Sequence, residues 1–216
     1  PGVIDLLSLD ELQSEIDKAF INTDTDSKIL AYTNDRVNDY NDYVRELRGL
    51  TATYTVGEHF VNNGSVDMGK DKKMLSVEER VTISKLSQDT DFIEITPGVD
   101  LEVRYATLTN DYLDQYVDIP LPEDKNHHQA LIKYFQKRKD WVPYFKLKNE
   151  FPDLRPCDAC TVHKSQGSTY DTVFIDLENI GSCRNPDQVA RMLYVAVSRA
   201  RNRIFLFGQL PTKYGG

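Results

Sequence analysis

The sequence has 216 residues and a formal net charge of −8, with 26 Lys and Arg against 34 Asp and Glu, and 40% of its residues are hydrophobic. Its 12 Tyr and 9 Phe exclude a disordered chain, because they can bury enough apolar surface to form a core. No apolar run approaches the ~18 residues of a membrane span, the N-terminus lacks signal-peptide features, and three Cys make a disulfide framework improbable. We therefore expect a globular protein of a reducing, cytoplasmic compartment.

The first quarter of the chain has the pattern of an α/β protein. Apolar residues at helical spacing predict a helix that ends near Ile21, and Ser8 with Glu11 fits a capping box at its start. A short apolar run over 28–33 predicts a buried strand. A helix is expected to follow over 35–47, ended by Gly49.

The pattern changes between about 54 and 118, where short runs of Val, Ile, Tyr and Phe alternate with polar residues. We expect a small antiparallel β-barrel inserted into the α/β domain and closed by Pro120 and Pro122. Its clearest predicted strands are 81–84, 92–95 and 101–105.

A helix rich in Lys, Tyr and Phe is expected over 125–148, with an interruption near Pro143. Its aromatic residues either pack against the protein core or stack on nucleic-acid bases. These residues are Trp141, Tyr144 and Phe145. Two adjacent histidines near the start of this helix, His127 and His128, are expected to form a solvated surface pair.

The α/β pattern returns in the last third of the chain. Strands are predicted over 157–163, 172–177 and 203–208, and a helix over 186–200. The expected organisation is one mostly parallel α/β domain formed by 1–53 and 150–216, with an inserted unit at 54–149.

Charge is distributed unevenly between these parts. Residues 155–216 contain eight basic and five acidic side chains and sum to +3, which leaves −11 for residues 1–154. The basic surplus therefore coincides with the densest motifs, and it favours a local site for phosphates within an acidic protein.

The strongest motif is Thr161–Asp171, which joins two apolar strands and contains hydroxyls, His, Lys, Gln and Gly. Loops at the carboxyl ends of strands in open α/β sheets are where ligands bind. Gly167 allows the backbone to approach a phosphate or ribose, while Thr161, His163 and Lys164 can donate to phosphate oxygens. The alternative is a polar turn between two core strands.

A second motif is the apolar helix segment 193–201, which ends in Ser-Arg-Ala-Arg. An arginine held by a rigid element can stabilise the charge that develops on a transferring phosphoryl group. Alternatively, Arg199 and Arg201 only complement the C-terminus of the helix.

These segments resemble conserved motifs of superfamily 1 helicases, in the form used by the RecD and phage Dda branch. Thr161–Asp171 resembles motif V, 193–201 resembles motif VI, and 29–47 resembles motif IV. In the motif IV segment, Asn34, Asn41 and Arg45 are spaced seven and four residues apart, so they share one face of the predicted helix. The resemblance implies a RecA-like domain, and the inserted barrel resembles the SH3-like insertion of those enzymes.

The resemblance also implies roles for individual residues. Arg199 matches the arginine finger of motif VI, which reaches the γ-phosphate of ATP bound to a partner domain. The implied nucleotide-binding residues are Gln166, Gly167 and Ser168, with Arg45 as a weaker phosphate contact and Arg36 as its alternative. The implied DNA-binding residues are Thr33, Asn34, Thr161, His163 and Lys164. Thr169 stands where a distant branch carries a ribose-contacting Glu, so ribose recognition by that route is in doubt.

No convincing Walker A motif is present in this sequence. Gly64–Asp71 approaches the pattern, but Asp71 stands where a Ser or Thr must bind Mg²⁺, and its carboxylate would repel phosphate. We therefore expect this chain to be the second motor domain of a longer ATP-dependent DNA helicase. ATP and Mg²⁺ would be the cofactors, and the ligands of Mg²⁺ would lie in an N-terminal RecA-like domain. Single-stranded DNA would be the partner, and the resemblance implies 5′–3′ translocation.

Three alternatives remain open. The chain is a non-catalytic nucleic-acid or protein-binding module, or it is the motor subunit of a nuclease–helicase complex in recombination or replication. The third is a zinc or redox protein that uses Cys157, Cys160 and His163. This last alternative is disfavoured because a strand would point the two cysteines to opposite faces.

Overall fold

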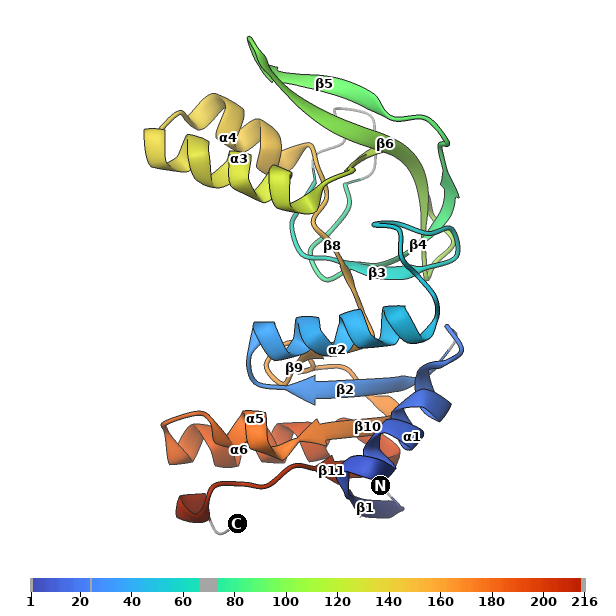
Figure 1. Ribbon diagram of the computed structural model, residues 1–216, viewed down its shortest axis with the longest axis vertical. Helices are drawn as coiled ribbons and strands as arrows, with labels where there is room; N and C mark the ends of the chain where they lie inside the picture. The colour runs from blue at the N-terminus through green and yellow to red at the C-terminus, as the bar shows by residue number, and fades with distance from the viewer. Residues whose placement is uncertain (1, 24, 67–73, 215–216) are drawn as a thin grey trace. The chain divides into compact units, whose positions relative to one another are not determined.

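The computed structural model describes residues 2–23, 25–66 and 74–214, apart from the side chain of Leu9, and divides into two compact units (Figure 1). Unit 1 comprises 1–51 and 157–216, and unit 2 comprises 52–156. The expected boundary at 149/150 differs from this division because Leu154–Pro156 pairs with a strand of unit 2. No described helix has the length and hydropathy needed to cross a membrane.

Unit 1 contains a five-stranded sheet in which every pairing is parallel, as an α/β protein requires. The strand order is β1-β11-β10-β2-β9. The strands are β1 (Val3–Leu7), β2 (Ser27–Ala31), β9 (Ala159–Thr161), β10 (Tyr170–Asp176) and β11 (Ala200–Phe207). The α/β class and the parallel sheet predicted from the sequence are confirmed.

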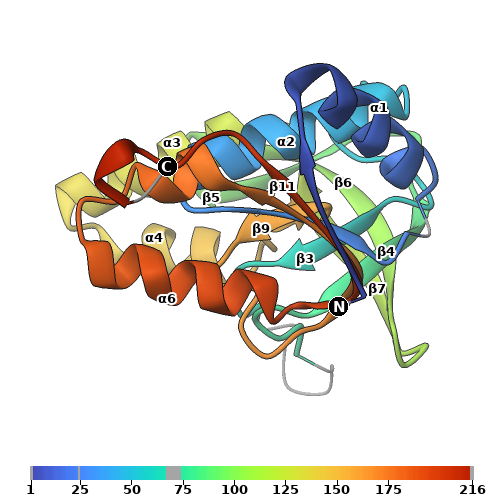
Figure 2. The same cartoon turned by 90° about the horizontal axis from the view of Figure 1, so that it is seen from below.

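Helices cover both faces of this sheet (Figure 2). The helices are α1 (Leu9–Phe20), α2 (Asn34–Leu47), α5 (Leu177–Gly181) and α6 (Pro186–Val197), with a 3-10 turn at Thr212–Tyr214. On one face Phe20 of α1 and Val44 of α2 pack with Phe174. On the other face Ile180 of α5 and Met192 of α6 pack with Ile175, the next residue along the same strand.

Local signals set the bounds of the first two helices. Ser8 and Glu11 form the predicted capping box, because each side chain accepts from the backbone N–H of the other. Thr33 caps α2 through its hydroxyl, which accepts from Arg36 N at 3.4 Å. The helix ends before Gly49, whose φ of +69° favours glycine.

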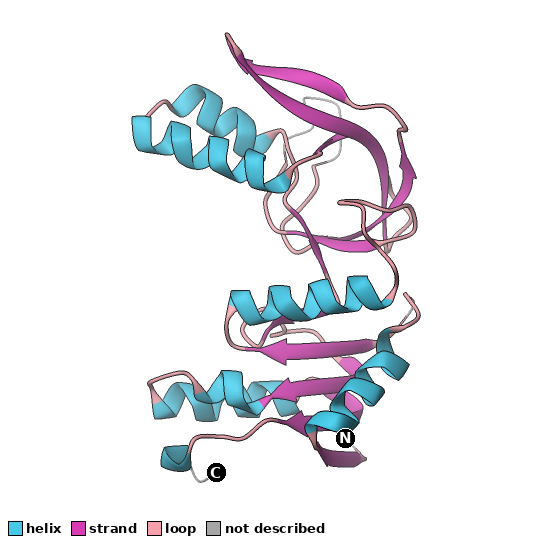
Figure 3. Ribbon diagram, viewed as in Figure 1, coloured by secondary structure: helices cyan, strands magenta, loops and turns pink. Residues whose placement is uncertain are grey.

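Unit 2 is an antiparallel sheet with a helical hairpin (Figure 3). The strands are β3 (His59–Asn62), β4 (Arg80–Leu86), β5 (Asp91–Thr96), β6 (Val99–Asn110), β7 (Gln115–Pro122) and β8 (Leu154–Pro156), and the helices are α3 (Lys125–Arg138) and α4 (Trp141–Asn149). The long strand β6 pairs with β4, β5 and β7. The strand order is β5-β6-β4-β3-β8, with β7 also paired to β6, and no described pairing joins β8 to β5 or β7, so the SH3-like barrel stays a prediction.

Three expectations for unit 2 were wrong. Pro120 and Pro122 do not close the predicted barrel, because they lie inside its strand β7. An edge strand tolerates a residue without an N–H. The helical segment breaks at Lys139, which has a φ of +57°, and Pro143 lies in the first turn of α4. His128 is buried, not solvated, and its ring packs beside Phe151 at 5.7 Å.

Two elements of unit 1 were not expected from the sequence. The N-terminal segment forms β1, an edge strand that pairs with β11 from Val3↔Arg203 to Leu7↔Phe207. The short helix α5 directly follows β10 and is capped by Asp176, whose carboxylate accepts from Asn179 N.

Candidate functional site

The carboxyl ends of β2 and β9 bring motifs IV and V together. The two strands are parallel neighbours, with Ala31 opposite Thr161, so the segments that follow them leave the sheet at the same edge. The rings of Tyr32 and His163 lie 6.2 Å apart just beyond that edge. The predicted DNA-binding residues of both motifs therefore lie in one region of unit 1.

These residues differ in how accessible they are. Asn34, His163 and Lys164 are exposed, and Thr33 is half-buried. Thr161 is only 8% exposed, and its Oγ1 accepts a hydrogen bond from Lys164 N at 3.3 Å. Its hydroxyl therefore helps to shape the loop, a role that the sequence did not predict.

The motif V loop, residues 162–169 after β9, folds into consecutive tight turns. Ser165 is fully buried and donates from Oγ to the Val162 carbonyl at 2.7 Å. Gln166 and Ser168 are exposed on either side of Gly167, which has a φ of +95°. A side chain at this φ would be strained, although nothing lies within 4 Å of the position its Cβ would take. The loop therefore presents open backbone at the predicted nucleotide-binding residues.

Arg199 connects motif VI to this loop. Its guanidinium Nη1 donates to the Ser168 carbonyl at 3.0 Å, and its Nε donates to the Val195 carbonyl in the last turn of α6 at 3.1 Å. Its Nη2 binds Ser198 Oγ at 2.8 Å. Arg199 thus complements the helix C-terminus and also holds the motif V loop, whereas Arg201 pairs with Asp26.

A hollow of about 830 Å³ lies between the loop and α6. His163 and Gln166 line it from the loop, and Gln188, Arg191 and Tyr194 line it from the helix. Tyr194 is 78% exposed. The sequence did not single out these helix residues, although a charged and an aromatic residue three positions apart on the outer face of an amphipathic helix are a usable signal.

The structure does not bring Arg45 to this region. Arg45 lies in the last turn of α2, on the α1–α2 face of the sheet, whereas the motif V loop and Arg199 lie on the α6 face. It is also about 16 Å along the helix from Asn34. Arg36, the alternative, lies at the start of α2 and donates from Nε to Asp176 at 2.9 Å.

A polar network around Asp176 and Asn179 fixes the motif IV loop, which contains Tyr32 and Thr33 between β2 and α2. Asn179 Oδ1 accepts from Tyr32 N at 2.7 Å and from Thr33 N at 3.0 Å, while its Nδ2 donates to Thr33 Oγ1 at 3.1 Å. Asp176 is 1% exposed and binds Arg36. Sequence reasoning missed both residues, but an acidic residue between a buried strand and a helix is a recognisable N-cap signal.

Cys157 and Cys160 are thiols of intermediate exposure. They flank Tyr170, whose pKa is raised by burial and by the neighbouring Cys160. Over residues 2–23, 25–66 and 74–214, no three His, Cys, Asp or Glu side chains gather as metal ligands would. The nearest approach to a P-loop, Gly64–Asp71, lies partly outside the described residues.

Comparison with known proteins gives a family match in the C-terminal part of the chain. Residues 156–207 match the family described as UvrD-like helicase C-terminal domain. A 97-residue stretch is 29% identical to the RecBCD enzyme subunit RecB of Chlamydia pneumoniae and covers 44% of this chain and 9% of RecB. Uncharacterized protein R530 of Acanthamoeba polyphaga mimivirus is 24% identical over 179 residues, which are 76% of this chain and 36% of that protein.

Solved structures similar to this chain include two Pif1 helicases, each 14% identical. The Candida albicans structure gives a TM-score of 0.40 and covers 85% of this chain and 45% of Pif1. The Bacteroides structure, in complex with ADP-AlF3 and ssDNA, gives a TM-score of 0.42 and covers 96% of this chain and 47% of Pif1. The chain spans less than half of each of these relatives. The predicted resemblance to the C-terminal region of a superfamily 1 helicase is confirmed by the match over residues 156–207.

Proposed function

We propose that this chain, which carries a superfamily 1 helicase C-terminal region, supplies the second motor domain of an ATP-dependent DNA helicase of the RecD and Dda branch. The observation that carries the proposal is the bond from Arg199 to the Ser168 carbonyl. It joins the segments that resemble motifs V and VI into one surface of unit 1. The proposed setting is cytoplasmic, in DNA replication or recombination.

The residues at the carboxyl ends of β2 and β9 would bind single-stranded DNA. His163, Lys164 and Asn34 are exposed there, and their side chains can donate to phosphate oxygens. Asn179 holds the backbone of Thr33, so the motif IV side of this surface is organised before a strand arrives. Translocation would run 5′–3′.

The nucleotide would contact the opposite end of the motif V loop. Gln166, Gly167 and Ser168 offer an exposed amide, open backbone and a hydroxyl, which fit a ribose or phosphate. ATP would supply the phosphoryl group for transfer to water, with Mg²⁺ held by residues of a first RecA-like domain. Arg199 would place its charge on that group, and it must first release Ser168 and Val195.

The proposal is tested by DNA-stimulated ATP hydrolysis in the longer protein, or in this chain supplied with a first RecA-like domain. We expect Arg199→Ala to lower kcat by about 10³–10⁵-fold while strand affinity changes little. Arg201→Ala is the matched control, because Arg201 is exposed and pairs with Asp26. Equal ATPase rates in the two variants would contradict the proposed arginine finger.

A second candidate is favoured by the similarity to RecB, which is named as a subunit of the RecBCD enzyme. In that case the chain belongs to a motor subunit of a nuclease–helicase complex. Purification of the longer protein from its own cells, followed by a nuclease assay on linear duplex DNA, separates the two. A co-purifying nuclease supports the complex, and its absence supports a helicase that acts alone.

A further inference from the structure

The helical hairpin α3–α4 concentrates positive charge in an acidic protein. Residues 125–149 contain seven Lys or Arg and one Asp, a formal charge of +6, whereas the whole chain carries −8. Two of the seven are occupied locally, since Lys125 Nζ donates to the Leu154 carbonyl and Lys146 Nζ to the Glu94 carbonyl. The other five are exposed: Lys133, Lys137, Arg138, Lys139 and Lys148.

These five cations have no carboxylate partner among the residues that the structure describes. In the parts of the chain that the structure describes, none of them forms an ion pair, whereas Arg48, Arg155 and Arg203 each do. Surface cations at this density repel one another, and one Asp does not neutralise seven basic side chains. The hairpin is therefore charged for a polyanionic partner.

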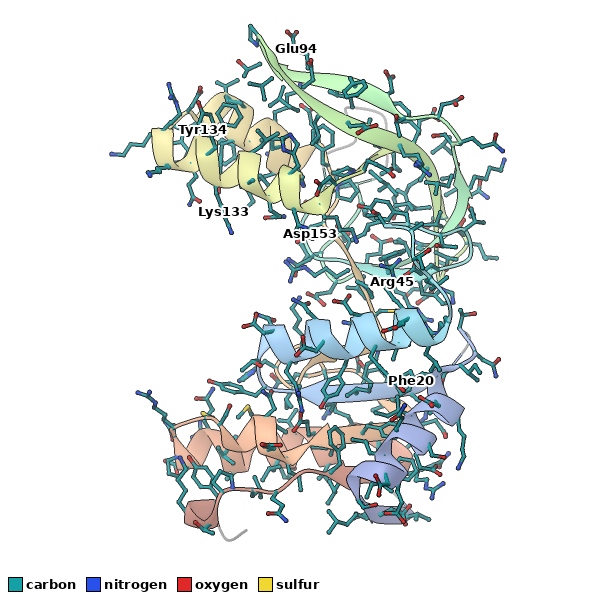
Figure 4. All side chains as sticks on the ribbon, viewed as in Figure 1. Phe20, Arg45, Glu94, Lys133, Tyr134 and Asp153 are labelled. Carbon is teal, nitrogen blue, oxygen red and sulfur yellow. The ribbon has the colours of Figure 1, made fainter. Side chains whose placement is uncertain are left out.

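Exposed aromatic rings accompany the cations at the end of the hairpin where α3 meets α4. Tyr134 is 50% exposed, Trp141 49% and Phe145 53%, and Figure 4 labels Lys133 and Tyr134 on α3. The rings of Trp141 and Phe145 lie 6.3 Å apart. The Arg138 guanidinium lies 5.4 Å from the centre of the Tyr134 ring, so charge and ring adjoin directly.

The core of unit 2 does not need these rings. Phe135 of α3 and Leu147 of α4 are buried with Leu101 and Val103 of β6, and Tyr144 packs against that cluster. The alternatives for the aromatic residues of this segment are thus divided: Tyr144 belongs to the core, whereas Trp141 and Phe145 lie largely outside it. Large apolar groups gathered on a surface mark a binding site.

We propose that the end of the α3–α4 hairpin is a binding surface for single-stranded nucleic acid, separate from the motif V loop. Its members are Lys133, Tyr134, Lys137, Arg138, Lys139, Trp141 and Phe145. Unpaired nucleotides present a flat base and a negative phosphate in every unit, which matches rings interleaved with cations. An acidic protein surface needs only the cations, and a duplex keeps its bases stacked away from the rings. The surface shares no residue with the proposed motor site, so it goes beyond that function.

Trp141 is the only tryptophan of the chain, so its fluorescence reports this surface directly. We expect saturable quenching when the full chain is titrated with oligothymidine or oligouridine, and weak quenching with a blunt duplex. A difference between the two oligonucleotides distinguishes DNA from RNA as the ligand. The measurement needs neither ATP nor a first motor domain, so its outcome is independent of the ATPase test.

Two variants test the two parts of the surface. Phe145→Ala should weaken oligothymidine binding by about 5- to 140-fold, the effect of one lost stacking contact. Phe92→Ala is its control, because Phe92 on β5 is 65% exposed and lies outside the hairpin. Replacing Lys137, Arg138 and Lys139 by Gln should reduce the slope of log affinity against log salt by about 2. Absence of Trp141 quenching, or equal affinity of the Phe145 and Phe92 variants, would overturn the proposal.

Discussion

The Tyr40 hydroxyl donates a 2.6 Å hydrogen bond to Oδ2 of Asp176, a carboxylate that is 1% exposed. Arg36 Nε donates to the same oxygen at 2.9 Å, and Asn179 N donates to the other carboxylate oxygen at 2.9 Å. Burial and this carboxylate together raise the pKa of Tyr40, which therefore remains a donor at every physiological pH. The start of α2 is in this way tied to the end of β10 beneath the motif IV loop.

Removal of this hydroxyl should destabilise unit 1. We expect Tyr40→Phe to lower the free energy of unfolding by about 1.5–3 kcal/mol, because a buried carboxylate loses a donor. Urea denaturation followed by circular dichroism measures the change. Tyr194→Phe is the control, since Tyr194 is 78% exposed. The free energy of unfolding of this variant should lie within about 0.5 kcal/mol of that of the parent. Equal effects would mean that Asp176 finds a replacement donor.

Asn41 joins the middle of α2 to β9. Its Nδ2 donates to the Ala159 carbonyl at 3.3 Å, and its Oδ1 accepts from Ala159 N at 2.8 Å. Asn41→Ala leaves these buried backbone groups without their partner and should cost about 1–3 kcal/mol. Asn38→Ala, on the exposed side of the same helix, should stabilise by a few tenths of a kcal/mol, because Ala has the higher helix propensity. Changes of the same sign and size in urea midpoints would refute this role.

Motif IV illustrates how much the sequence predicts. The bounds of α2 could be predicted closely, because Thr33 and Gly49 are local signals for a helix start and end. The role of Asn41 could not, because its partner Ala159 is 118 residues away in the sequence. Shared helical spacing suggested a functional face for Asn41 and Arg45, whereas burial makes Asn41 structural.

The same limit applies to β1 and to the candidate site. Val3, Ile4 and Leu6 are all exposed on an edge strand, so no alternation of apolar residues reveals it. Its partner strand β11 lies near the other end of the sequence. In the site, motifs V and VI were recognisable from residue types alone. Asp176 and Asn179 acquire their roles only from contacts with residues of motif IV.

His128 makes the stability of unit 2 depend on pH. Its Nε2 donates to the Leu147 carbonyl at 2.9 Å, and burial lowers its pKa from the ordinary 6.5. As pH falls below about 6.5 the unfolded chain takes up a proton that the folded chain refuses, so stability decreases on acidification and is fully present above that pH. The slope from one such proton reaches at most about 1.4 kcal/mol per pH unit.

His128→Gln should remove this contribution, because an amide can donate to Leu147 without titrating. We expect the variant to be less stable than the parent at neutral pH and to lose less stability between pH 7 and pH 5. Urea titrations across that range measure the difference. The parent protein, titrated in parallel, is the control. An unchanged slope in His128→Gln would show that the buried ring is not the titrating group.

The bonds of Arg199 predict a local effect that this chain can show without ATP. A guanidinium donates to the Ser168 and Val195 carbonyls at the same time, whereas a lysine ammonium at the end of a flexible stem cannot reproduce this fork. Arg199→Lys should therefore loosen the motif V loop and speed amide hydrogen exchange at Gln166–Ser168, with little change in global stability. Arg201→Lys should leave these amides as protected as in the parent, because Arg201 pairs with Asp26. If exchange at Gln166–Ser168 is the same in both variants, Arg199 does not hold the loop. Its bonds to Val195 and Ser198 would then be its main structural role.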